Sequence, residues 1–94
     1  MPERYVLVRW PDGAAQRIYS PSTIVEEYFS AGQRLPVADF VEQAREALGI
    51  ASERVRQAYG QPCGHAARSI ASVEARAAVQ VQGSGEVVVE GIQA

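Results

Sequence analysis

The stretch from residue 20 to residue 60 constrains the fold of this chain more than any other segment. Its apolar residues recur at helical spacing, and a proline or glycine interrupts it at positions 21, 32, 36, 49 and 60. Because proline and glycine begin or end helices, this pattern predicts several short helices rather than one long helix. No group of residues in it has the spacing of a catalytic or metal site, so the stretch informs the architecture and leaves the chemistry open.

Two helices are expected in the first half of this stretch. Ser20 is a candidate N-cap and Pro21 a candidate first residue of a helix that Gly32 ends. This segment is short, so an irregular extended segment is the alternative. The better helix is 36–48, because its apolar residues share one amphipathic face. They fall at positions i, i+3, i+4, i+7 and i+11: Val37, Phe40, Val41, Ala44 and Leu48.

Two further helices are expected after a break at Gly49. Ser52 caps a short helix that Gly60 ends, with its charged residues facing outward. The last helix covers about 63–81, begins after Pro62 and carries an apolar stripe rich in alanine. Alanine lets a neighbouring helix or sheet approach closely, so this helix is expected to pack tightly along one side.

A β-hairpin is expected at the N-terminus and one further strand at the C-terminus. Residues 4–10 are rich in β-branched and aromatic residues, and the Pro-Asp-Gly sequence that follows predicts a turn, so residues 14–20 are expected to form the returning strand. The terminal segment 86–90, EVVVE, predicts a third strand. We expect this strand to pair with the hairpin, because an isolated hairpin is only marginally stable in water.

These elements predict an α+β fold in a single domain that spans residues 1–94. The expected element order is β-β-α-α-α-β, with a small three-stranded antiparallel or mixed sheet. The first strand of the hairpin lies at its centre, which gives the order 2-1-3. Three to four helices are expected to cover one face of this sheet.

The composition is that of an ordinary small domain. A chain of 94 residues buries one modest core, so a monomer would be marginally stable and a homodimer is expected. The formal net charge of −2 gives no field that attracts nucleic acid or acidic lipid. A single cysteine excludes an intramolecular disulfide and fits a reducing compartment. With no signal peptide and no apolar run of membrane-spanning length, cytoplasmic localisation is expected.

Four segments together carry a resemblance to a known family: RWPDG, YSPSTIVEEYF, LPVADFVEQAREALGIASERVRQAYG and the late Cys63. In this order they resemble the small bacterial proteins of a nitrogen starvation response family, over nearly the whole chain. Genes of that family lie beside those for a nitrilase, a radical-SAM enzyme, an acetyltransferase and a flavin-dependent oxidoreductase. The resemblance implies a role in this nitrogen-linked cluster, in nitrile or cyanide assimilation, and it implies no catalytic residues.

Cys63 is the candidate reactive thiol of the chain. It stands at an expected helix start, where the helix dipole would favour the thiolate, and His65 would be its base. Against this, side chains two positions apart diverge on a helix, so we favour a Cys63 that begins the buried stripe. Two ligands do not satisfy zinc, so no metal or other cofactor is expected unless a dimer shares the site.

A helix-turn-helix at residues 37–59 is an alternative to a binding role. The sequence around Gly49 resembles the turn of that motif, and Arg54 and Arg56 would lie on its recognition helix. However, Arg45 stands where the motif needs a small residue, and the acidic balance of the chain opposes DNA binding. A nucleic-acid partner is therefore disfavoured.

Three carboxylates share one expected helix: Asp39, Glu42 and Glu46. Paired carboxylates serve acid–base chemistry in some sites. Spacings of three and four on an amphipathic helix are more typical of a solvated face. We therefore expect a solvated face on which Glu42 pairs with Arg45.

The corner that follows the first strand is the preferred contact surface for a partner or ligand. Arg9, Trp10 and Asp12 lie there, and Trp10 is expected to be partly exposed because it ends a strand beside a turn. A groove lined by the aromatic side chains is a further hypothesis, although such residues more often form the core.

The function expected is that of a non-enzymatic accessory protein that binds a partner enzyme of the gene cluster or a small metabolite. Two alternatives remain: a DNA-binding regulator that uses residues 37–59, and a thiol-dependent enzyme or redox sensor that uses Cys63. In the favoured interpretation no residue is catalytic. The homodimer would form through a sheet edge or through the alanine-rich last helix.

Overall fold

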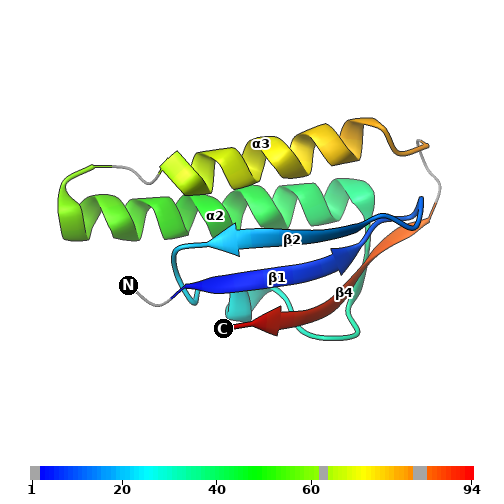
Figure 1. The fold of residues 1–94 in the computed structure, drawn as a ribbon, viewed down its shortest axis with the longest axis horizontal. Helices are drawn as coiled ribbons and strands as arrows, with labels where there is room; N and C mark the ends of the chain where they lie inside the picture. The colour runs from blue at the N-terminus through cyan, green and yellow to red at the C-terminus, as the bar shows by residue number, and fades with distance from the viewer. Residues whose placement is uncertain (1–2, 62–63, 82–84) are drawn as a thin grey trace.

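The computed structural model of the protein describes residues 3–61, 64–81 and 85–94. These residues form one antiparallel sheet and two long helices that lie side by side along it (Figure 1). The elements in chain order are β1 (Arg4–Arg9), β2 (Ala15–Ser20), α1 (Val25–Tyr28), β3 (Arg34–Pro36), α2 (Val37–Tyr59), α3 (Gly64–Ala78) and β4 (Glu86–Gln93). The α+β class expected from the sequence is confirmed.

The N-terminal hairpin forms as the sequence predicts. β1 and β2 pair antiparallel over their full length. Two backbone hydrogen bonds close the turn: the Trp10 N–H donates to the Ala14 carbonyl at 2.8 Å, and the Gly13 N–H donates to the Trp10 carbonyl at 2.9 Å. Gly13 has a φ of 90°, a conformation that glycine adopts without the steric penalty of a Cβ.

The C-terminal strand lies at the centre of the sheet, beside β1. The strand order is β2-β1-β4-β3, so the predicted order of the hairpin and the last strand is confirmed. The prediction of three strands is wrong, because β3 pairs antiparallel with β4 and makes the element order β-β-α-β-α-α-β. A three-residue strand that ends in proline is too short to show the alternation of apolar and polar residues by which a strand is predicted from sequence. Two backbone hydrogen bonds extend its pairing: the Gly32 N–H donates to the Val89 carbonyl at 2.7 Å, and the Val89 N–H donates to the Gln33 carbonyl at 2.8 Å.

The segment between β2 and β3 is mostly irregular, and its helix is a single turn. Ser20 ends β2 and does not cap a helix. Its buried hydroxyl donates to the Ser22 carbonyl at 2.7 Å. Ile24 precedes α1 and makes no side-chain cap. The prediction of a helix from Ser20 to Gly32 is therefore wrong, and the alternative of an irregular segment describes most of this region.

α2 runs without interruption through Gly49, so the predicted break there is wrong. Nothing lies within 4 Å of a Cβ built on Gly49, and the residue is exposed, so it costs the helix only its propensity of about 1 kcal/mol. The apolar face continues across it, and its burial outweighs that cost; the buried residues are Phe40, Ala44, Ala47, Leu48 and Ala51. Gly60 ends the helix as predicted, in the left-handed conformation.

Because α2 contains no turn, residues 37–59 do not form a helix-turn-helix, and that alternative is wrong. The two arginines proposed to contact DNA instead contact residues of this domain. Arg54 donates to the Ser22 hydroxyl at 3.0 Å, and Arg56 pairs with Glu53 one turn earlier. Within the described residues, no helix has both the length and the apolar character needed to cross a bilayer.

The core lies between the sheet and the helices, with two aromatic rings at its centre. Trp10 and Phe40 meet edge to face with ring centroids 5.4 Å apart, and Phe29 packs against Phe40 at 5.3 Å. Buried strand residues complete this layer: Val6, Val8, Ile18, Val87 and Val89. They alternate along their strands, because successive side chains point to opposite faces of a sheet.

α3 is shorter than the predicted helix 63–81, and only part of its apolar stripe is buried. Ala66 and Val73 are fully buried, whereas Val81, beyond the helix end, is 76% exposed. The Ser69 hydroxyl donates to the Tyr19 carbonyl at 2.8 Å, which places α3 over the outer edge of β2. Cys63, expected to begin the stripe, lies outside the described residues.

Candidate binding groove

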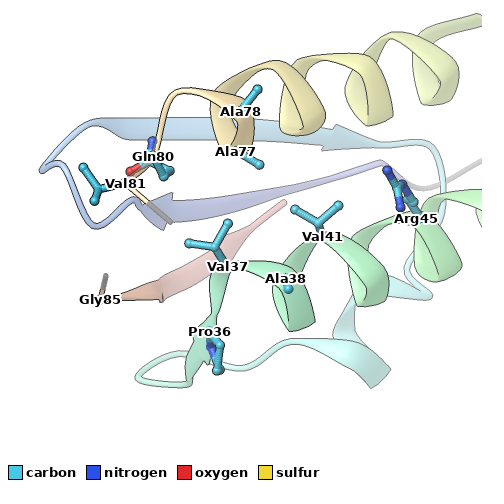
Figure 2. Close-up of a pocket in the computed structure, with 10 residues that line it drawn as sticks. All are labelled: Pro36, Val37, Ala38, Val41, Arg45, Ala77, Ala78, Gln80, Val81 and Gly85. Atoms are coloured by element: carbon cyan, nitrogen blue, oxygen red, sulfur yellow. The ribbon is translucent and has the colours of Figure 1, made fainter. Parts of the chain in front are cut away.

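An apolar groove of about 730 Å³ lies between the first turns of α2 and the last turns of α3 (Figure 2). Its walls come from both helices: Val37, Ala38 and Val41 from α2, and Ala77, Ala78 and Val81 from the end of α3 and the residues after it. Pro36 and Gly85 complete one side, and two polar side chains, Arg45 and Gln80, also line it.

Side-chain size explains why the groove stays open. Leu48 of α2 and Val73 of α3 lie outside the groove, in the closed part of the helix pair, and both are fully buried in the common core. Towards the start of α2, the facing residues on α3 are alanines, and Val41 and Ala77 are only half buried. Alanine methyl groups cannot fill the space between two helix backbones, so a cavity remains.

Arg45, on α2, places a cation at one end of the groove, and Gln80 lies at the opposite end (Figure 2). Its Nε donates to Oε2 of Glu74 on α3 at 2.6 Å, and its Nη2 pairs with the same oxygen. The predicted pairing of Arg45 with Glu42 is therefore replaced by a bridge between the two helices. Both partners are exposed, at 58% and 40% of their side-chain surface, so the pair stabilises the fold by only about 0.2–1 kcal/mol.

Gln80 is held at the other end of the groove by the hairpin turn. Its Oε1 accepts from the Asp12 N–H at 3.2 Å, and its Nε2 donates to Oδ2 of Asp12 at 3.2 Å. The backbone N–H of Ala14 lowers the pKa of the Asp12 carboxyl, and the Gln80 amide and the Arg76 charge lower it further. The carboxylate therefore stays ionised and fixes this end of the groove.

The structure separates the three residues of the predicted contact surface. Trp10 is 1% exposed, so the expectation of a partly exposed ring is wrong; its strand position points it into the core, where Nε1 donates to Gln16 at 2.8 Å. Arg9 is exposed, and it donates to Glu90 at 3.2 Å and to the Gly13 carbonyl at 2.8 Å. Asp12 is exposed and holds Gln80. The corner supports the hairpin and presents no aromatic contact.

Thiol chemistry at Cys63 stays a prediction, because that residue lies outside the described part of the chain. His65 is exposed, and its ring lies edge-on to Tyr19 with centroids 5.6 Å apart. Among residues 3–61, 64–81 and 85–94, no three histidine, cysteine or acidic residues cluster as metal ligands would.

The three helix carboxylates are exposed, as a solvated face requires: Asp39, Glu42 and Glu46. Burial raises the pKa of the Tyr28 hydroxyl, and its hydrogen bond to Glu46 raises it further.

The aromatic residues do not line one groove. Trp10 and Phe29 belong to the core, whereas Tyr59 is 67% exposed at the far end of α2.

The groove itself was not expected from the sequence. Val37 and Val41 belong to the apolar face predicted for helix 36–48, and Ala77 belongs to the alanine-rich last helix, but neither prediction indicates a space between the two helices. The one sequence feature that could have indicated a groove is the excess of alanine on the last helix. That feature instead led to the expectation of close packing.

The family model of the nitrogen starvation-induced protein NitG matches residues 5–92. This range includes all of the fold except the first residue of β1 and the last residue of β4, and it includes the described residues that line the groove. No curated protein and no solved structure matches the chain. The chain belongs to the family of nitrogen starvation-induced protein NitG.

Proposed function

We propose that this protein is a non-enzymatic binding protein of the nitrogen starvation response, and that the groove between α2 and α3 is its binding site. The observation that carries the proposal is the groove itself. Its volume of about 730 Å³ is that of a small-molecule site, and its walls are aliphatic with two polar groups. Such a surface holds the apolar body of a metabolite or an apolar side chain of a partner enzyme.

The lining supports binding over catalysis. Among the described residues that line the groove, Arg45 is the one with an ionisable side chain. A guanidinium keeps its proton at physiological pH, so it orients and neutralises an anion but does not act as a general base. Acid–base catalysis needs a group that titrates near the working pH.

The partner class follows from the resemblance to the nitrogen starvation family. We place the protein beside the enzymes of a nitrile-assimilation gene cluster, as a carrier or sensor of one of their metabolites or as an accessory subunit. Two features argue against a homodimer through the sheet edges. α3 covers β2, and β3 is three residues long and ends in Pro36, which cannot donate to a further strand. A dimer would therefore use the helices.

A neutral apolar dye tests the groove as a binding site. Nile red should gain fluorescence with the wild-type protein, and Ala77→Trp should remove most of that gain because the indole fills the space between the helices. Ala71→Trp is the matched control, since Ala71 is exposed on α3 and does not line the groove. Equal fluorescence with both variants would contradict the proposal.

The non-enzymatic role has its own test. The purified protein should not turn over nitriles or cyanide, and Cys63→Ser should behave as the wild type does. Turnover that the serine variant abolishes would replace the binding role with thiol catalysis.

A further inference from the structure

We propose that the ligand of the groove is an elongated monocarboxylate with an apolar body, whose carboxylate binds Arg45. This inference rests on the proposed function of the groove as a binding site. It adds the chemical class of the ligand and its direction of binding.

The two polar ends of the groove differ in what they offer. At one end, Gln80 is neutral, and its amide is already engaged by Asp12 and by the Arg76 carbonyl at 2.9 Å. At the other end, Arg45 presents a guanidinium cation, which pairs with the exposed carboxylate of Glu74. The apolar walls lie between them (Figure 2). A ligand that complements this arrangement has one anionic end, an aliphatic or aromatic body and no second charge.

The spacing of the groove residues sets the length of the ligand. Val37 and Arg45 are eight residues apart on one helix, which is about 12 Å at 1.5 Å per residue. This is close to the extended length of a medium-chain carboxylate. Asp12 holds Gln80 in place at the end of the groove away from Arg45. A partner helix would extend beyond both ends of the groove, whereas a compact ligand fits between Gln80 and Arg45.

The Arg45 guanidinium has donors to spare. Nε and Nη2 both contact one oxygen of Glu74, and Nη1 makes no hydrogen bond to another described residue. A guanidinium carries five N–H donors and binds carboxylates through two of them at once. The Arg45–Glu74 pair is solvent-exposed, so a ligand carboxylate exchanges with Glu74 at little cost.

This geometry makes Glu74 a competitor of the ligand. Removing its charge leaves Arg45 unpaired and should tighten carboxylate binding, whereas removing the Arg45 charge should weaken it. If the ion pair only stabilised the packing of the two helices, neutralising Arg45 and neutralising Glu74 would change the affinity for the carboxylate in the same direction. The opposite signs therefore distinguish ligand binding from a structural role.

Calorimetric titration with octanoate and with 1-octanol tests the inference. Octanoate should bind the wild type at least about tenfold more tightly than octanol, as a charge-assisted contact implies. Arg45→Gln should remove this preference, and Glu74→Gln should tighten octanoate several-fold without changing octanol. Arg56→Gln is the matched control, because it also removes one exposed, paired arginine from α2 but lies away from the groove.

The outcomes separate the two proposals. Equal affinities for octanoate and octanol in the wild type, both lost in Ala77→Trp, would overturn the carboxylate inference and leave the groove as a binding site. Failure of both probes, together with Nile red fluorescence that is indifferent to Ala77→Trp, would overturn the binding site as well. Octylamine binding as tight as octanoate would also contradict the inference, because the cation should be repelled by Arg45.

Discussion

The pair formed by α2 and α3 has two sections that differ in side-chain volume. In the closed section, Leu48 and Val73 are fully buried and belong to the common core. In the open section, Val41 faces Ala77 and Ala78 across a groove of about 730 Å³. A change from leucine and valine to alanine on the facing surfaces converts a packed contact into a cavity. Burial between the two helices is therefore more complete in the closed section.

The largest expected effect comes from removing a core side chain next to the groove. Phe40→Ala should lower the free energy of unfolding by about 3–5 kcal/mol, because Phe40 is fully buried against Trp10 and Phe29. Val41→Ala, one residue later on the groove wall, should cost less than about 1.5 kcal/mol, since Val41 is only half buried. Urea denaturation measures both, and equal losses would contradict the difference in burial between the core and the groove wall.

A smaller effect, of the opposite sign, tests the continuity of the helix that carries both sections. Gly49→Ala should stabilise the protein by about 0.5–1 kcal/mol, because the added methyl group meets no neighbour and alanine is the better helix former. A helix-turn-helix with glycine in a left-handed turn would be destabilised by the same change. The midpoint of thermal unfolding reports the sign directly.

The smallest effect concerns the Gln80 end of the groove and depends on pH. The pKa of Asp12 is lowered in the folded protein, chiefly by the Ala14 N–H, so its carboxylate contributes stability above the unfolded pKa. That contribution is lost as the pH falls through the lowered folded pKa. Asp12→Asn should therefore destabilise the protein slightly near neutral pH, and the difference in melting temperature should shrink in the acid range. A difference that grew on acidification would contradict the assigned direction.

Local features of the fold could be predicted where one short sequence signal decides the conformation. The turn at Gly13, the end of α2 at Gly60 and the placement of the last strand beside β1 follow from glycine conformation and strand composition. The fourth strand could not be predicted, because β3 is too short to show a period and forms through its pairing with β4. Gly49 suggested a break, and the burial of Leu48 and Ala51 overrides its low propensity.

The site was less predictable than the fold. Trp10 is expected to be partly exposed because it adjoins a turn, yet it shares one face of the strand with Val6 and Val8 and is buried with them. The groove depends on how far two helices lie apart where their facing side chains are small, and this distance is not encoded in either helix alone. Arg45 could be identified as exposed, but its partner Glu74 lies 29 residues away and is set by the helix pairing.

Amide chemical-shift mapping during an octanoate titration identifies the binding surface residue by residue. If the groove binds octanoate, the largest shifts should fall on Val37, Val41 and Ala77, with Arg45 at the edge of the affected region and Val73 unchanged. Shifts confined to the opposite face of the sheet, around Leu7 and Val88, would contradict binding in the groove and assign it to a different surface.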